Sequence, residues 1–227
     1  STAMLRSWGN RPDTAVVDEP LYAHYLKATG VDHPGRDEVI RRHETDWRKV
    51  VAELTGPIPS GKSIFYQKHM THHLLTAIDR EWLAGLTHAF LIRDPREMLP
   101  SLIRNIPNPT IADTGLQQQI EIFELVQRRT GRTPPIVDAR DVLTDPRRSL
   151  GLLCEALGVL FDESMLRWPP GRRDTDGVWA PHWYAAVEKS TGFETYRLKV
   201  HALPAVPRRV LDECVEHYDR LPAPAIR

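Results

Sequence analysis

Short apolar runs alternate with longer amphipathic segments along this chain. The runs at residues 15–17, 64–67 and 89–92 suit strands and are too short for helices of their own, and the segment 134–141 suits a further strand that ends in charge. Apolar residues recur at helical spacing in the segments 47–54, 115–129, 145–157 and 208–221. The alternation predicts an α/β fold, a three-layer, doubly wound and mostly parallel sheet with helices on both faces.

The remaining segments are less regular. Residues 1–8 resemble the first turns of an amphipathic helix with Ser1 or Thr2 as N-cap, residues 33–42 read as polar surface, and residues 70–78 are expected to be helical. An α/β domain usually begins with a strand, and none precedes this first helix. We therefore expect residues 1–227 to form a single domain whose first strand and loop lie upstream of the sequence.

Charged residues follow the apolar runs at the points where strands are predicted to end. Asp18 and Glu19 follow the first run, and Lys68 and His69 follow the second. The carboxyl ends of parallel strands form the ligand-binding edge of such a sheet. Asp18 and Glu19 also suit the N-terminus of a helix with Pro20 at its first position, and both interpretations can hold together.

The third run leads into the most informative stretch of the sequence. Arg93 follows the strand at once, Pro95 and Glu97 suit a first helical turn, and Ser101 lies about two turns into that helix. A cation and a hydroxyl at a strand end suit a phosphate. The alternative is that Arg93 pairs with Asp94 and has a structural role only.

The segment from Gly56 to Ser63 matches the phosphate-loop pattern GxxxxGK[ST]. Such a loop needs a strand before it and a helix after it, whereas here a predicted helix precedes and a predicted strand follows. Pro57 and Pro59 also remove two amides that would hold phosphates. The segment is therefore expected to be a helix-to-strand loop.

Three histidines, His69, His72 and His73, have the spacing of one helical face. No carboxylate or cysteine completes a recognisable ligand set, so we expect no metal site. A Lys-His pair at a strand end is better suited to handling an anion or a proton.

Composition restricts the kinds of partner. The 227 residues are 26% charged with a formal net charge of zero, so no global field favours nucleic acid or an anionic membrane. No apolar run is long enough to span a bilayer. Cys154 and Cys214 occur in helical patterns and suit thiols of a reducing compartment, which indicates a cytoplasmic protein. A homodimer is compatible with these features.

The order of these motifs resembles the sulfotransferase family, above all bacterial sulfotransferase-like proteins of unknown substrate. The most specific part is Arg93-Asp94-Pro95-Arg96-Glu97 with Ser101, which fits the family pattern R-[DN]-P-[RK]-[DE]-x-x-x-S. The segment 137–159 is similar to a second family run, although Asp138-Ala139-Arg140-Asp141 stands where many members carry Tyr-Glu-Asp. The resemblance implies a P-loop NTPase-like fold of the sulfotransferase type.

The resemblance also implies a cofactor, 3′-phosphoadenosine 5′-phosphosulfate. Arg93 and Ser101 would hold its 3′-phosphate, and a looser match places Lys189, Ser190, Thr191 and Gly192 in a loop covering that phosphate. Ser1 and Thr2 would be the tail of the loop that binds the 5′-phosphosulfate. Most of that loop would precede Ser1.

For catalysis, one branch of the family uses a histidine near a strand-end lysine and another uses a glutamate after the first helix. The counterparts are His69 and Glu19, and Glu19 is favoured as the base. Lys68 or His69 would then stabilise the bridging oxygen as it leaves. The aromatic segments 21–25 and 179–184 suit either the wall of an acceptor pocket or packing of the core.

The function implied is transfer of a sulfuryl group to a hydroxyl or amine of a small-molecule acceptor. One alternative is a non-catalytic module on the same fold that binds adenosine bisphosphate or a partner. Another is a kinase that uses Gly56 to Ser63.

Overall fold

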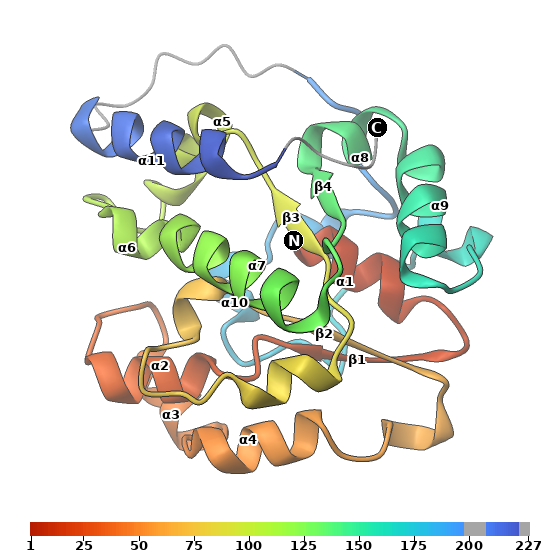
Figure 1. The fold of residues 1–227 in the computed structure, drawn as a ribbon, viewed down its shortest axis with the longest axis horizontal. Helices are drawn as coiled ribbons and strands as arrows, with labels where there is room; N and C mark the ends of the chain where they lie inside the picture. Colours follow the sequence, from red (N-terminus) through yellow and green to blue (C-terminus); the bar gives the residue numbers. More distant parts are fainter. Residues whose placement is uncertain (198–207, 223–227) are drawn as a thin grey trace. The chain divides into compact units, whose positions relative to one another are not determined.

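The computed structural model describes residues 1–197 and 208–222 of the chain (Figure 1). Two compact units make up the fold. The first contains Ser1–Leu86 and Phe161–Glu194, and the second contains Thr87–Leu160 and Thr195–Arg227. In the described residues, each unit has a two-stranded parallel sheet, which confirms the predicted α/β class and the parallel pairing.

The sheet of the first unit pairs β1 (Thr14–Asp18) with β2 (Ile64–Lys68). Val16 lies opposite Tyr66 in the register, and Asp18 lies opposite Lys68. Because side chains alternate between the two faces of a strand, these two pairs face the same way and the pair Val17–Gln67 faces the other way.

Helices cover both faces of this sheet. On one face, α1 (Thr2–Gly9) stacks Trp8 on Tyr66 with ring centroids 5.2 Å apart. A Cβ at Gly9 would come within 3.3 Å of Val16, so the glycine allows close approach. On the other face, the Gln67 side chain donates to the carbonyl of Leu54 in α4 (Trp47–Leu54) at 2.8 Å. The unit is thus layered helix, sheet, helix, as the doubly wound prediction requires.

An aromatic core lies beside this sheet, between helices from distant parts of the sequence. It joins α2 (Tyr22–Thr29) and α3 (Arg36–Arg42) to α10 (Ala180–Trp183). The buried members of the cluster are Tyr22, Ala23, Tyr25, Leu26, Val39, Trp179, Ala180 and Tyr184. The two predicted aromatic segments therefore pack together as core.

The second unit pairs β3 (Phe90–Ile92) with β4 (Ile136–Asp138), and Ile92 lies opposite Asp138. The connection contains α5 (Pro95–Leu102), α6 (Ile111–Thr114) and α7 (Leu116–Thr130). Helix α7 packs on the sheet through Phe123, whose ring meets Phe90 edge-on at 5.4 Å, and Gln119 donates to the carbonyl of Leu91 at 3.1 Å.

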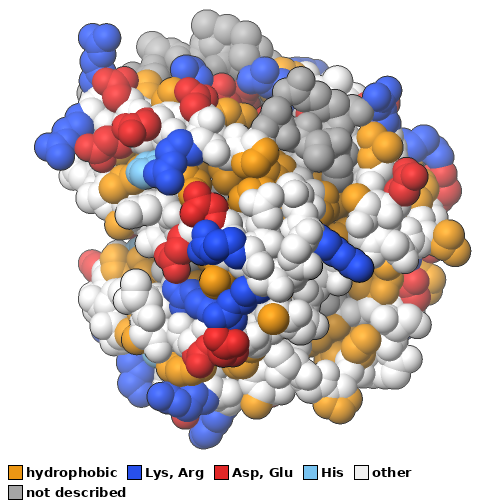
Figure 2. Space-filling model, in the orientation of Figure 1, with side chains coloured by type: hydrophobic (Ala, Val, Ile, Leu, Met, Phe, Trp, Pro, Cys, Tyr) orange, Lys and Arg blue, Asp and Glu red, His pale blue; other side chains and the backbone are white. Residues whose placement is uncertain are grey.

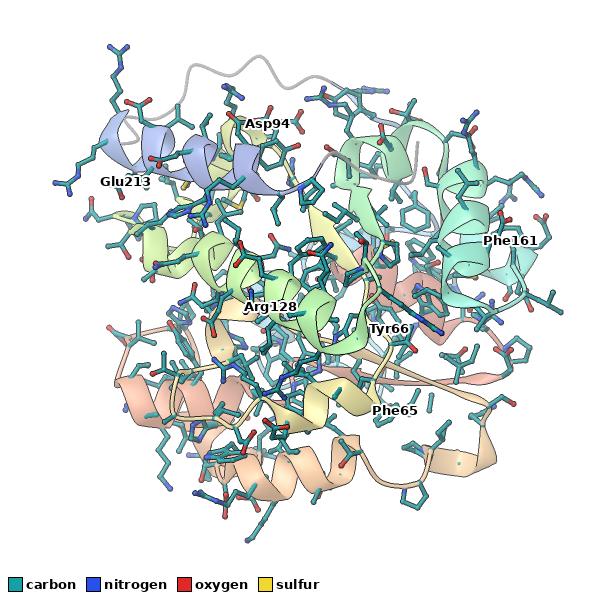
Figure 3. All side chains as sticks on the ribbon, viewed as in Figure 1. Phe65, Tyr66, Asp94, Arg128, Phe161 and Glu213 are labelled. Carbon is teal, nitrogen blue, oxygen red and sulfur yellow. The ribbon has the colours of Figure 1, made fainter. Side chains whose placement is uncertain are left out.

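Three further helices complete this unit, namely α8 (Ala139–Thr144), α9 (Pro146–Leu157) and α11 (Arg208–Arg220). Helix α11 carries Glu213 (Figure 3) and buries Cys214 against Leu99 and Leu116. Asp145 caps α9, and Gly158 ends it in the left-handed conformation. Cys154 and Cys214 are both buried thiols.

Residues 33–42 lie mostly at the surface as expected, and they form α3 and bury His33 and Val39. Another expectation is wrong. Residues 70–78 contain only a 3-10 turn at Thr71–His73 in place of a helix. The guanidinium of Arg80 donates to the carbonyls of Leu75 and Leu74 at 2.8 and 2.9 Å, so these groups are satisfied without helical amides.

The helix after Glu19 also begins later than expected. Its first residue is Tyr22, with Leu21 as N-cap, so Pro20 lies in the turn before it. The loop at residues 56–63 connects α4 to β2 through a 3-10 turn at Pro59–Gly61, which confirms the helix-to-strand interpretation.

Basic and acidic side chains lie side by side on the face drawn in Figure 2. Among the described residues, no helix combines the length and the apolar character that a bilayer span requires.

Candidate active site

Glu19 follows the last residue of β1 in a left-handed conformation, with φ at 42°. Its amide donates to the carbonyl of Lys68, and its carbonyl accepts from the amide of Tyr22, both at 2.9 Å. A non-glycine residue in this conformation costs about 1–3 kcal/mol, and such residues cluster at functional sites. The turn holds the side chain of Glu19 at the carboxyl end of the sheet.

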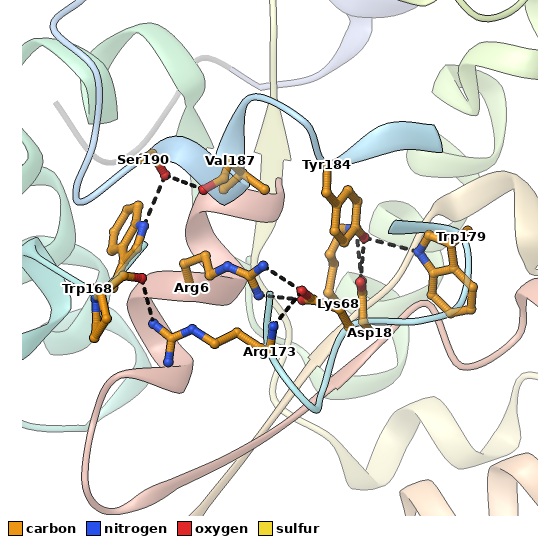
Figure 4. Close-up of polar contacts among 11 residues, drawn as sticks. Arg6, Asp18, Lys68, Trp168, Arg173, Trp179, Tyr184, Val187 and Ser190 are labelled. Atoms are coloured by element: carbon orange, nitrogen blue, oxygen red, sulfur yellow. Dashed lines mark hydrogen bonds and ion pairs between the residues drawn. The ribbon is translucent and has the colours of Figure 1, made fainter. Parts of the chain in front are cut away.

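Lys68 ends the neighbouring strand and joins Glu19 in a buried polar network, of which Lys68, Asp18, Tyr184 and Trp179 are labelled in Figure 4. Its Nζ donates to Glu19 Oε1 at 2.6 Å, to Asp18 Oδ1 at 2.9 Å and to the hydroxyl of Tyr184 at 3.0 Å. All three donors of the ammonium are therefore used. The Lys68 side chain is 4% exposed and Asp18 1%, whereas Glu19 is 13% exposed. Glu19 is the carboxylate of the network with access to solvent.

Tyr184 completes this network. Its hydroxyl donates to the Asp18 carboxylate and accepts from Nε1 of Trp179 at 3.2 Å. Burial raises the pKa of Tyr184, and nearby carboxylates raise it further, so the phenol stays a donor. The sequence assigned the segment 179–184 either to an acceptor pocket or to the core, and it did not predict that Tyr184 and Trp179 would join the strand-end network.

The charges in the network depend on one another. Burial lowers the pKa of Lys68, but the carboxylates of Glu19 and Asp18 outweigh it and hold that pKa well above its ordinary value. Burial raises the pKa of Asp18 against the opposing effect of the Lys68 ammonium. Lys68 is thus a fixed cation that stabilises the carboxylates around it.

A stacked histidine faces the other oxygen of Glu19. Nδ1 of His73 lies 4.0 Å from Glu19 Oε2, and the imidazole stacks on Tyr22 with centroids 4.7 Å apart. Burial is the main cause that holds the pKa of His73 well below its ordinary value, and the neighbouring His72 is the second. The imidazole is therefore neutral at pH 7.

His69 does not share the contacts of Lys68. Its Nε2 lies 3.3 Å from Oε1 of Gln67, its ring is 6.0 Å from that of Trp82, and the residue is half-buried. Residues 71–73 form a 3-10 turn, so the expected helical face of histidines is absent. In the described part of the chain, no three His, Cys, Asp or Glu side chains group as metal ligands.

A cavity of about 500 Å³ borders Pro20, the residue after Glu19. Its walls come from β1, β2, α4 and the loop after α4, and they are mostly apolar. Among the lining residues are Val17, Leu54, Pro57 and Phe65. This size lies within the range of pockets for small molecules.

Arg93 and Ser101 belong to the second unit. Arg93 directly follows β3, its side chain is 37% exposed, and its Nε lies 3.7 Å from Glu97 Oε2. Asp94 caps α5 by accepting from the amide of Arg96 at 2.8 Å (Figure 3). Ser101 is exposed on the same helix. A partly exposed guanidinium and an exposed hydroxyl are chemically suited to a phosphate.

Glu97 is the centre of a polar cluster that the sequence did not reveal. It accepts from Nη2 of Arg140 at 3.1 Å and from the hydroxyl of Tyr196 at 2.7 Å. Glu97 raises the pKa of Arg140, so that guanidinium is a permanent cation. Arg140 and Tyr196 are 43 and 99 residues from Glu97, which explains why local spacing did not connect them.

The remaining predicted cofactor residues lie in the first unit. Ser1 is the N-cap of α1, which begins at Thr2. Ser190 accepts from Nε1 of Trp168 at 3.0 Å, Thr191 accepts from the amide of Trp168 at 3.1 Å, and Gly192 forms an antiparallel bridge with Arg167. Lys189 ends a short 3-10 turn. Thus Ser190, Thr191 and Gly192 make structural contacts, and a phosphate-covering role for these residues stays a prediction.

Comparison with known proteins connects this geometry to a family. Two curated Arabidopsis thaliana proteins, named branched-chain-amino-acid aminotransferase-like proteins 1 and 2, are 38% and 36% identical over 222 residues. These matches cover 97% of this chain but 38% and 39% of the two relatives, so the chain spans less than two fifths of their length. Both relatives are plant proteins, and the expected bacterial kinship stays a prediction.

A solved sulfotransferase domain from the curacin biosynthetic pathway matches 91% of this chain and 74% of its own, with 14% identity and a TM-score of 0.33. The sequence model of the family described as "Sulfotransferase domain" matches residues 1–224. This match spans nearly the whole chain and includes both strand-end sites. The chain belongs to the sulfotransferase-domain family.

Proposed function

We propose that this domain transfers a sulfuryl group from 3′-phosphoadenosine 5′-phosphosulfate to a hydroxyl or amine of a small acceptor. The observation that supports this best is the strained Glu19 at a strand end, bonded to Lys68 at 2.6 Å in a member of this family. A carboxylate with one side in a fixed ionic network and 13% exposure suits a general base.

In this mechanism Glu19 accepts the proton of the acceptor hydroxyl or amine as that group attacks sulfur. All three N–H donors of Lys68 are used and its side chain is 4% exposed, so its proposed role is to orient the Glu19 carboxylate. His69 is half-buried and is our assignment for stabilising the bridging oxygen. When bound, the cofactor supplies the sulfuryl group and leaves as adenosine 3′,5′-bisphosphate, taking the electron pair of the broken S–O bond.

The residues proposed to bind the cofactor are supported by two kinds of observation, namely their exposure in the structure and their resemblance to the family pattern. Arg93 and Ser101 bind the 3′-phosphate in this proposal, and their exposure at the end of β3 supports it. Ser1 and Thr2, at the start of α1, and Lys189 to Gly192 are assigned to the cofactor by family resemblance. The apolar cavity beside Pro20 suits a small acceptor. A cytoplasmic setting and a homodimer belong to the same proposal.

A second candidate is a non-catalytic module that binds adenosine bisphosphate or a partner protein. This candidate is favoured by Lys68, which is buried and uses all three N–H donors of its ammonium group within the protein. Ion networks with a purely structural role have the same two properties. The kinase alternative lacks comparable support. Lys62, which would contact phosphates, instead donates to the carbonyl of Pro12 at 2.6 Å.

The test uses the full-length protein in two measurements. Calorimetry compares adenosine 3′,5′-bisphosphate with ATP, and radiolabelled sulfuryl transfer is followed over a panel of hydroxyl and amine acceptors. We expect preferential binding of the bisphosphate and transfer that Glu19→Gln abolishes. Binding without transfer to any acceptor would favour the non-catalytic module, and a preference for ATP would overturn both candidates.

A further inference from the structure

Arg93 and Arg140 leave the same edge of the second sheet. Strand β3 ends at Ile92 and β4 ends at Asp138, and these two residues are partners in the parallel register. Arg93 follows its strand by one residue and Arg140 by two. The fold therefore starts both long cationic side chains from neighbouring strand ends.

Glu97 brings the two guanidinium groups together. Nε of Arg93 lies 3.7 Å from its Oε2, and Nη2 of Arg140 lies 3.1 Å from its Oε1. The two arginines thus approach opposite oxygens of one carboxylate. Glu97 is itself held by the Tyr196 hydroxyl at 2.7 Å, and the Arg140 guanidinium lies over the Tyr196 ring, 5.5 Å from its centroid. This arrangement restricts the positions that both cations can take.

The neighbouring aspartates cap helices, and Asp94 Oδ2 also lies 3.9 Å from Nη2 of Arg140. Asp138 accepts from the amide of Arg140 at 2.7 Å and from the hydroxyl of Tyr218 at 3.0 Å. Asp94 accepts from the amide of Arg96 at 2.8 Å. The guanidinium groups remain accessible, because the side chains of Arg93 and Arg140 are 37% and 47% exposed.

We infer that Arg140 is a second phosphate-binding arginine, which contacts the 3′-phosphate of the nucleotide together with Arg93. This inference rests on the proposed function, in which Arg93 binds that phosphate. A phosphate monoester carries about two negative charges near pH 7, and its three terminal oxygens accept from more than one guanidinium. Arg93 approaches Glu97 through Nε at 3.7 Å, and its guanidinium carries two further nitrogens that can donate to a phosphate. Glu97 is the positioning residue for the pair.

Calorimetry on the full-length chain tests the inference with two nucleotides, adenosine 3′,5′-bisphosphate and adenosine 5′-phosphate. The variants are Arg140→Gln, Arg140→Lys, Arg93→Gln and, as a matched control, Arg96→Gln. Arg96 lies between Arg93 and Glu97 in the sequence and pairs with Asp94 at 3.3 Å. Its replacement by glutamine therefore removes one positive charge close to the proposed phosphate site. Thermal unfolding of each variant reports whether the fold is kept.

We expect Arg140→Gln to weaken the bisphosphate by about 10- to 100-fold and the 5′-phosphate by less than about 3-fold. Arg140→Lys keeps the charge without the planar fork and should lose an intermediate amount. Arg96→Gln should affect both nucleotides by less than about 3-fold, since an exposed charge acts through screened solvent.

The possible failures are distinguishable. A wild-type protein that binds both nucleotides equally has no 3′-phosphate site, and the proposed function fails with the inference. If Arg93→Gln weakens the bisphosphate selectively but Arg140→Gln does not, the inference on Arg140 is wrong while the proposed function stands. Equal losses for both nucleotides in Arg140→Gln, or equal effects of Arg140→Gln and Arg96→Gln, would also contradict a direct contact.

Discussion

Glu19 and Lys68 leave the ends of two paired parallel strands and meet at 2.6 Å. The parallel register sets Lys68 beside Asp18, and the left-handed turn at Glu19 brings the second carboxylate to the same ammonium. The two carboxylates differ in access, because Asp18 is sealed by Tyr184 while Glu19 is partly exposed. The network therefore buries one carboxylate and leaves the other partly accessible, as the proposed role of Glu19 as base requires.

Replacing Glu19 by glutamine tests its chemical role. The amide keeps the shape of the side chain but cannot accept a proton, so we expect sulfuryl transfer to fall by about 10²–10⁴-fold. Bisphosphate affinity should stay within about threefold, because Glu19 is not among the residues assigned to the 3′-phosphate. Initial rates and calorimetry check this, with the exposed Glu155→Gln on α9 as control. If Glu19→Gln leaves the rate of sulfuryl transfer unchanged, the role of base would be assigned to His69.

Replacing Lys68 by methionine tests the structural role of the network. The substitution leaves the carboxylates of Asp18 and Glu19 buried or half-buried without their cation, so we expect a loss of about 3–5 kcal/mol in the free energy of unfolding. Denaturant titration measures it. Lys62→Met is the control, because Lys62 is exposed and makes one contact with a backbone carbonyl.

The double variant Asp18→Asn with Lys68→Met separates charge from packing. Neutralising Asp18 removes one of the unpaired buried charges, so we expect it to recover part of the stability lost in Lys68→Met. No recovery would show that the Lys68 side chain acts through packing alone.

The sequence predicted the elements that local patterns determine. The strands at Thr14–Asp18 and Phe90–Ile92 are apolar runs that end on charge, and α4 and α9 follow helical spacing with clear end signals. Parallel strands then placed Glu19 and Lys68 at one edge. This part of the site was predictable because it depends on strand ends alone.

The rest depends on contacts between distant residues. Tyr184 reaches Asp18 across 166 positions, and Arg140 reaches Glu97 across 43, so neither pair has a signal in local spacing. The expected helix at residues 70–78 failed for a different, local reason. Its carbonyls are satisfied by the guanidinium of Arg80, a competition that hydrophobic periodicity does not register.

A buried ion pair attaches the loop before α10 to the first helix. Arg6 on α1 makes a bidentate contact with Asp176, with one bond at 2.7 Å, and the two side chains are 2% and 0% exposed (Figure 4). We expect Asp176→Asn to cost about 3 kcal/mol or more in the free energy of unfolding, because it leaves a buried guanidinium without a counter-charge.

The matched control for this pair is Asp37→Asn, which breaks the exposed ion pair of Arg36 and Asp37 at 3.0 Å. Exposed pairs contribute about 0–1 kcal/mol, so the control should change the free energy of unfolding little. Chemical denaturation of both variants checks the difference. Similar losses in the two would contradict the structural importance of the Arg6 contact.

His73 predicts that the protein loses stability below neutral pH. Burial holds the pKa of His73 well below that of an unfolded histidine, about 6.5, so only the unfolded chain takes up this proton as pH falls below 6.5. The neutral His73 therefore makes its full contribution to the free energy of unfolding above pH 6.5. As pH falls, this contribution decreases by about 1.4 kcal/mol per pH unit until the pKa of the folded state is reached. Denaturant titrations from pH 7.5 to 5.5 should show a smaller slope for His73→Phe, which keeps a ring against Tyr22. Burial also lowers the pKa of His43, which is half-buried. We therefore expect His43→Phe to reduce the pH dependence of the unfolding free energy by a smaller amount. If wild type and His73→Phe show the same dependence of unfolding free energy on pH, the folded protein takes up the His73 proton as readily as the unfolded chain does, and the prediction is wrong.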